Sequence, residues 1–152
     1  MINEIKGDLL TAKGIILHGV NTQGVMGSGV ALAIRNKWPK VFTEYLKHVA
    51  SKRPGGHLLG DVQEVHLFGS DNTIVMNCFT QEFYGKDGRK YASYDAMDAC
   101  MQQVAVLAAI DGTLAINFPL IGCHLGGLNW NVVREIIDFR IPDTFEKNLW
   151  KL

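Results

Sequence analysis

The sequence has few cysteines, no excess of charge of either sign and no long hydrophobic run. Its three cysteines, Cys78, Cys100 and Cys123, are odd in number and widely spaced, which argues against a disulfide framework and indicates a reducing compartment. Fifteen basic residues balance fifteen acidic ones, so a bulk electrostatic attraction to nucleic acid or to an anionic membrane is not indicated. No apolar run approaches the ~20 residues that span a bilayer, and the first ten residues lack the apolar core of a signal peptide. These absences predict a cytoplasmic protein that has no membrane partner.

Length and composition predict one globular domain over residues 1–152. A chain of this length buries roughly two-thirds of its extended-chain surface on folding. Hydrophobic residues make up 47% of the chain and charged residues 20%, values that favour a folded globule over a disordered segment. No internal repeat, low-complexity tract or linker divides the sequence.

Apolar patterns typical of strands alternate with patterns typical of helices. Strands are expected at residues 2–6, 15–17, 61–68, 73–79, 114–118 and 144–152. Helices are expected at residues 30–37, 39–49, 94–107 and 129–139, with Ser93 as an N-cap. We expect loops at residues 51–56, 71–72 and 80–92, the last of them exposed and mobile. This alternation predicts a three-layer α/β/α fold with a mixed, mostly parallel central sheet.

A glycine-rich loop follows the second expected strand. Polar residues at positions 18, 21 and 23 come first, then glycines at 24, 27 and 29, and then a helical pattern. Glycine lets the main chain approach a ligand, and the N–H groups at a helix start point at anions. Neither a phosphate-loop lysine nor the dinucleotide G-x-G-x-x-G spacing is present. Taken alone, the loop fits an anion site or a tightly packed loop of small residues equally well.

A second glycine-rich loop, residues 121–128, follows the expected strand at 114–118. In an open α/β sheet such loops lie at the carboxyl ends of the strands, where ligands bind. Two of them at the same edge predict a cleft that binds a diphosphate or a similar anion.

Three motifs carry a resemblance to a known family. They are Gly-Asp-Leu-Leu at residues 7–10, the stretch from His18 to Ala31, and the stretch from Pro119 to Trp130. Together they resemble macrodomains, the α/β/α modules that bind ADP-ribose, and the resemblance covers nearly the whole chain. It is strongest to the branch that holds the ADP-ribosyl-glutamate hydrolase and the antitoxin that removes ADP-ribose from DNA.

The resemblance implies a set of ligand contacts and no cofactor. Asp8 would accept a hydrogen bond from the adenine amino group, and Asn21 would hold the distal ribose. Residues 27–30 would enclose that ribose and its phosphate, and residues 122–127 would bind the diphosphate through main-chain N–H groups. The implied ligand-binding residues are Asp8, Leu9, Asn21, Gly27, Ser28, Gly29, Val30, Ile121, Gly122, Cys123, His124, Leu125 and Gly126.

The preferred reaction is hydrolysis of ADP-ribose 1″-phosphate to ADP-ribose and phosphate. The yeast phosphatase of this family has a histidine in the place that matches His18, and a histidine with a pKa near neutrality is a general acid or base. His18 and Asn21 are therefore the expected catalytic pair, with Asn21 orienting the substrate. The alternative for His18 is a half-buried side chain bonded to a main-chain group.

Two other functions remain open. The related hydrolases have a lysine after a strand-ending threonine, where this chain has Gln81 after Thr80, and glutamine is not a nucleophile or base. Lys86 or Lys90 can take that role in removing ADP-ribose from protein or DNA. The glutamate hydrolase has an aspartate where this chain has Gly126, whereas the DNA-specific antitoxins have glycine. The remaining alternative is a non-catalytic protein that binds ADP-ribose.

The second loop also holds His124 and Cys123. His124 is a second catalytic candidate, although a simple loop residue or a hydrogen-bond donor to phosphate is favoured over a catalyst. Cys123 is expected to be a packed small residue, because no basic partner adjoins it. His18, His124, Cys78 and Cys123 do not have metal-ligand spacings, so neither a zinc site nor any other metal site is expected.

Overall fold

The computed structural model describes residues 1–52, 57–69 and 72–152. Six strands form one sheet in the order β1-β6-β5-β2-β4-β3. Neighbouring strands are parallel except for β3 and β4, which run antiparallel. This confirms the expected mixed, mostly parallel sheet. The strands are β1 (Ile2–Lys6), β2 (Ile15–Asn21), β3 (Val62–Leu67), β4 (Thr73–Gln81), β5 (Ala115–Phe118) and β6 (Glu146–Lys151).

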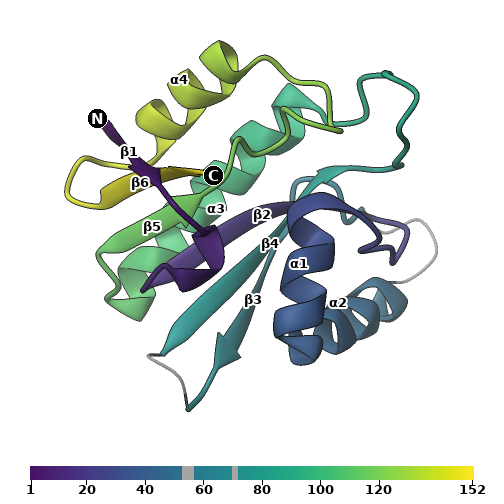
Figure 1. The fold of residues 1–152 in the computed structure, drawn as a ribbon, viewed down its shortest axis with the longest axis horizontal. Helices are drawn as coiled ribbons and strands as arrows, with labels where there is room; N and C mark the ends of the chain where they lie inside the picture. Colours follow the sequence, from purple (N-terminus) through teal and green to yellow (C-terminus); the bar gives the residue numbers. More distant parts are fainter. Residues whose placement is uncertain (53–56, 70–71) are drawn as a thin grey trace.

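Helices cover both faces of this sheet (Figure 1). One core cluster joins strand residues such as Leu17 to Met101 and Ile137 of α3 and α4. The other joins Ile16 to Tyr45 and its neighbours in α1 and α2. The three-layer α/β/α arrangement is therefore confirmed. The helices are α1 (Gly29–Lys37), α2 (Pro39–Ser51), α3 (Tyr94–Asp111) and α4 (Trp130–Arg140), with a 3-10 turn, η1, at Leu9–Thr11.

Local sequence signals explain where the helices begin. The Ser93 hydroxyl accepts a hydrogen bond from the N–H of Ala96, and the Asn129 side chain accepts one from Asn131. Pro39 occupies the first turn of α2, where its missing N–H costs nothing. These caps fix the helix starts close to the expected positions.

Two strands extend beyond their expected ends. β2 continues from Leu17 to Asn21, and β4 continues from Phe79 to Gln81, because the added residues pair across the two strands as His18 with Asn77 and Asn21 with Gln81. Of the loop expected at residues 51–56, Ser51 instead ends α2 and positions 53–56 lie outside the described residues. The expected turn at 71–72 also falls partly outside them. Among the described helices, none combines the length and apolar character that crossing a bilayer requires.

Candidate functional site

The loop that follows β2 is held in shape by two buried side chains. Asn21 accepts a hydrogen bond at Oδ1 from the N–H of Gln23 (2.9 Å) and donates from Nδ2 to the carbonyl oxygen of Val25 (2.8 Å). The hydroxyl of Tyr45, on α2, lies 2.6 Å from the main-chain oxygen of Asn21 and 2.8 Å from its Oδ1, and donates to this pair. The same hydroxyl accepts the N–H of Gly24 at 3.1 Å. Strand end, loop and α2 are thus joined through one polar cluster.

This loop ends in the exposed start of α1. Ser28 is the N-cap, but its hydroxyl makes no capping hydrogen bond. The first N–H that reaches a helical acceptor is that of Leu32, which donates to Ser28 at 3.3 Å. The N–H groups of Gly29, Val30 and Ala31 therefore have no acceptor among the described residues. A Cβ at Gly29 would meet no atom within 4 Å, so the space beside this helix start is open.

The second loop, residues 119–129, curls back on itself. The N–H of Leu128 donates to the carbonyl oxygen of Gly122 at 2.9 Å, and Gly122 and Gly127 have left-handed φ angles of 74° and 80°. A Cβ at Gly126 would lie 2.5 Å from the Gly122 oxygen, so the turn requires glycine there. Several N–H groups of this loop have no acceptor in the described parts of the chain: those of Gly122, His124, Leu125, Gly126 and Gly127.

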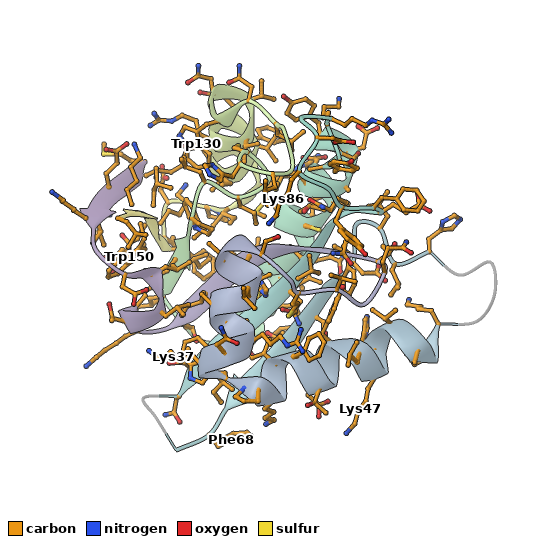
Figure 2. The ribbon with its side chains drawn as sticks, turned by 45° about the vertical axis from the view of Figure 1, so that its right-hand side comes forward. Lys37, Lys47, Phe68, Lys86, Trp130 and Trp150 are labelled. Carbon is orange, nitrogen blue, oxygen red and sulfur yellow. The ribbon has the colours of Figure 1, made fainter. Side chains whose placement is uncertain are left out.

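The segment between β4 and α3 packs against this second loop. The N–H groups of Tyr91 and Ala92 both donate to the carbonyl oxygen of Gly126, at 3.0 and 2.9 Å. A Cβ at Gly127 would lie 3.0 Å from the Cα of Lys90. The expectation of an exposed loop is thus confirmed for residues 86–90, while Ala92 is buried. In Figure 2, Lys86 on this segment and Trp130 lie at the end of the molecule opposite Phe68.

The two glycine-rich loops lie at the same edge of the sheet. β2 and β5 are parallel neighbours, with Ile15 paired to Ile116, so their carboxyl ends are adjacent (Figure 1). A Cβ at Gly19, near the end of β2, would lie 3.7 Å from the Ile121 side chain of the second loop. The prediction that both loops lie at one edge is therefore confirmed. This edge carries main-chain N–H donors from two neighbouring loops, which is an arrangement suited to an extended anion.

A model of the Macro domain family matches residues 17–137. The chain belongs to this family.

Similar proteins include two with named activities. An ADP-ribose 1″-phosphate phosphatase of Candida albicans is 32% identical over 148 residues, covering 86% of this chain and 87% of that protein. A DNA ADP-ribosyl glycohydrolase of Mycobacterium tuberculosis is 30% identical over 148 residues, covering 97% of this chain but 39% of the relative. Among solved structures, a protein of unknown function from Bacteroides thetaiotaomicron matches with a TM-score of 0.88 and 28% identity, covering 100% and 98% of the two chains.

His18 lies inside this macrodomain rather than at a strand end. It is the fourth residue of β2, and only 1% of it is exposed. Burial lowers the pKa of its imidazole from 6.5 to about 4, against the opposing effect of a hydrogen bond with Asn77. A ring that reaches no solvent and stays neutral near pH 7 does not exchange protons with a bound ligand. This burial argues against proton transfer by His18, and its assignment as a catalytic residue stays a prediction.

A chain of hydrogen bonds fixes the tautomer of His18. The Glu44 carbonyl oxygen only accepts, so the Gln63 amide donates to it at 2.9 Å. Asn77 Nδ2 then donates to Gln63 Oε1 at 3.0 Å, which leaves Asn77 Oδ1 to accept from His18 Nε2. His18 thus carries its proton on Nε2, while its buried Nδ1 has no partner among the described residues. The side chain shapes the interior beneath α2.

Asn21 and Asp8 lie close to the ligand-binding edge but have structural partners. Asn21 is 6% exposed, and its amide already fixes the loop, so its position favours a role in shaping the site. Asp8 is exposed at the carboxyl end of β1 and caps η1, accepting the N–H of Leu10 at Oδ1 (3.0 Å). Its second carboxylate oxygen makes no hydrogen bond with another described residue. Leu9 beside it is buried, at 7% exposure, in the core cluster under α1 and α2.

The remaining candidates differ in exposure. His124 is exposed in the second loop. Cys123 is half-buried, donates from Sγ to the Ile121 carbonyl oxygen (3.3 Å), and has its thiol pKa raised to about 11 by burial. That thiol stays protonated, as a packed small residue would. Gln81 donates from Nε2 to the Phe83 carbonyl oxygen at 2.7 Å, beside Asn21 in the strand pairing.

Sequence reasoning missed three residues that support this edge: Tyr45, Asn77 and Gln63. Tyr45 falls in the helix expected at residues 39–49, and its spacing there gives no sign of the hydroxyl contact. Asn77 falls in the strand expected at residues 73–79. A polar residue inside an otherwise apolar strand was the available signal, since buried amides require partners.

Proposed function

We propose that this macrodomain binds ADP-ribose and hydrolyses ADP-ribose 1″-phosphate to ADP-ribose and phosphate. The observation that carries the binding is the set of main-chain N–H groups, at the start of α1 and in the second glycine loop, that have no acceptor among the described residues. Asp8 stands at the carboxyl end of β1, on the same edge of the sheet, and serves the adenine end. Residues 27–30, which include Ser28, bind the distal ribose and its phosphate.

The number of donors favours a diphosphate. A hydrogen bond to a charged group contributes about 1.5–3 kcal/mol, and a helix start adds about 0.3–1 kcal/mol for a nearby anion. Two such groups of donors match a ligand with two linked phosphates better than a single carboxylate. This reasoning supports ADP-ribose or its 1″-phosphate over AMP.

The similarity to the Candida phosphatase supports the reaction. Because His18 is buried, we assign proton transfer to His124, which is exposed among the N–H donors of the second loop. There it can protonate the leaving ribose oxygen or activate the attacking water.

Phosphate release from ADP-ribose 1″-phosphate tests the reaction. His124→Ala should lower kcat by about 100-fold or more, the usual contribution of a general acid or base. His57→Ala, which removes another exposed histidine, is the matched control and should retain full activity. Absence of turnover by the wild type, or full turnover by His124→Ala, contradicts this assignment.

A second candidate function is removal of ADP-ribose from a modified protein or DNA. It is favoured by the similarity to the mycobacterial glycohydrolase and by Lys86 and Lys90, which are exposed on the segment bonded to the second loop. ADP-ribosylated DNA and protein treated with wild type, Lys86→Ala and Lys90→Ala distinguish this function. It requires release by the wild type and loss of release in one lysine variant. Tight ADP-ribose binding with every substrate intact indicates a non-catalytic binding protein instead.

A further inference from the structure

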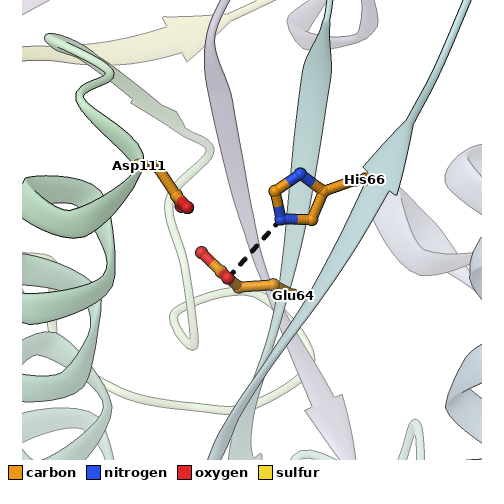
Figure 3. A group of neighbouring side chains, drawn as sticks. All are labelled: Glu64, His66 and Asp111. Carbon is orange, nitrogen blue, oxygen red and sulfur yellow. Dashed lines mark ion pairs between the residues drawn. The ribbon is translucent and has the colours of Figure 1, made fainter.

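A histidine and two carboxylates lie together where the edge strand β3 meets the C-terminal end of α3, away from the glycine loops. Glu64 and His66 are two residues apart on β3, so their side chains share the face toward α3. They pair with the early part of β4, and Asp111 is the last residue of α3. Figure 3 shows the three side chains pointing toward one another.

The spacing of these groups is that of ligands around one ion. One ligand atom from each residue lies within 4.8 Å of the others, and His66 Nε2 is 3.6 Å from Glu64 Oε2. Metal–ligand bonds of about 2.1 Å in a tetrahedral zinc site place neighbouring ligand atoms about 3.4 Å apart. Small side-chain movements therefore suffice to bring all three groups onto a common ion.

The cluster also has unmet negative charge. Glu64 Oε1 and Asp111 Oδ2 are shielded from solvent and have no hydrogen-bond partner among the described residues. Within residues 1–52, 57–69 and 72–152, no lysine or arginine pairs with either carboxylate. Asp111 also lies at the C-terminal, negative end of the α3 dipole. A cation would offset all of these costs.

Space for further ligands adjoins the cluster. A surface hollow of about 330 Å³ is lined by His66 and Asp111, and by Asn72, Thr73 and Thr113. Water molecules in this hollow can complete the coordination of an ion that takes three ligands from the protein.

We propose that Glu64, His66 and Asp111 bind a zinc ion. The imidazole nitrogen favours zinc over Mg²⁺ or Ca²⁺, which prefer oxygen ligands and more of them. The bound ion ties the edge strand β3 to the end of α3, and it stabilises the fold at a distance from the glycine loops. Sequence spacing does not reveal the site, because Asp111 is remote in sequence from the Glu64–His66 pair.

Calorimetric titration of metal-free protein with ZnCl₂ tests the site. We expect one zinc ion per chain, a raised Tm, and no comparable effect of MgCl₂. His66→Ala and Glu64→Gln should weaken zinc binding at least tenfold, whereas His57→Ala, which removes an exposed histidine outside the cluster, should not. Circular dichroism of each variant without metal checks that it is folded. Absence of saturable binding, or equal binding by His66→Ala, overturns the proposal.

NMR of the histidine ring nitrogens in the wild type gives a second test that needs no variant. Zinc should move the Nε2 resonance of His66 and leave those of His57 and His124 in place. A zinc response confined to His57 or His124 overturns the proposal. An unchanged His66 resonance at saturating zinc also overturns it, because the ion would then be bound without the imidazole.

Discussion

At the scale of single residues, His18 shows what a buried polar side chain does to stability. Its Nε2 is satisfied by Asn77, but desolvation still lowers its pKa to about 4. In the unfolded chain the same ring titrates near pH 6.5. As pH falls below about 6.5, the unfolded state binds a proton on His18 that the folded state does not bind. The free energy of unfolding therefore decreases until the pH reaches about 4.

This shift predicts a loss of about 3 kcal/mol of stability across that pH range. His18→Gln keeps an amide donor near Asn77 and cannot be protonated, so its unfolding free energy should fall less steeply with pH. Urea unfolding of both proteins between about pH 7 and pH 4 measures the difference. If the unfolding free energies of wild type and His18→Gln fell in parallel with pH, His18 would not titrate as its burial implies.

At the scale of elements, the ends of β2 and β5 determine the shape of the ligand-binding edge. Tyr45 links α2 to the loop after β2 through Asn21 and Gly24, and Gly126 lets the second loop close on Gly122. The first contact joins a helix to a loop, and the second closes a loop on itself. Loss of either should therefore change binding more than it changes the sheet.

Tyr45→Phe keeps the ring against Phe79 and removes the hydroxyl. Because buried polar groups of Asn21 and Gly24 lose a partner, we expect a stability loss of about 1–3 kcal/mol and weaker ADP-ribose binding. Thermal unfolding and calorimetry measure the two effects, with the exposed Tyr84→Phe as the control. Unchanged affinity in Tyr45→Phe would mean that the loop keeps its shape without this hydroxyl.

Gly126→Ala tests the second loop. The added Cβ would lie 2.5 Å from the Gly122 oxygen and 3.0 Å from the Ala92 Cβ, so the loop must open. We expect ADP-ribose affinity to fall at least tenfold. Gly112→Ala, at a left-handed position with nothing within 4 Å, is the control: it should cost stability but leave binding intact. Equal affinities in the two variants would argue against a closed second loop.

At the scale of the whole molecule, local signals were enough for the layers of the fold but not for the interior polar contacts. Ser93, Asn129 and Pro39 act within a few residues, so their effect on helix starts was predictable. The His18–Asn77 contact joins positions 59 residues apart, and no local pattern shows that a polar residue will be satisfied inside the sheet. For the same reason the sequence predicts too early an end for β2 and gives no sign that the His18 ring is buried.

The adjacency of the two glycine loops was predictable because parallel strands end at one edge. The sequence does not predict which N–H groups of the second loop lack acceptors among the described residues, because this depends on the turn geometry around Gly122 and Gly126. The Glu64, His66 and Asp111 cluster depends in the same way on the packing of α3 against β3.

Titration of ¹⁵N-labelled protein with ADP-ribose, followed through its main-chain amide resonances, shows whether both glycine loops contact the ligand. Binding at one site per chain should shift the amides of Gly29, Val30 and Ala31 together with those of residues 122–127. Saturable binding that leaves either group of amides unmoved, or no binding, would contradict a site built from both loops.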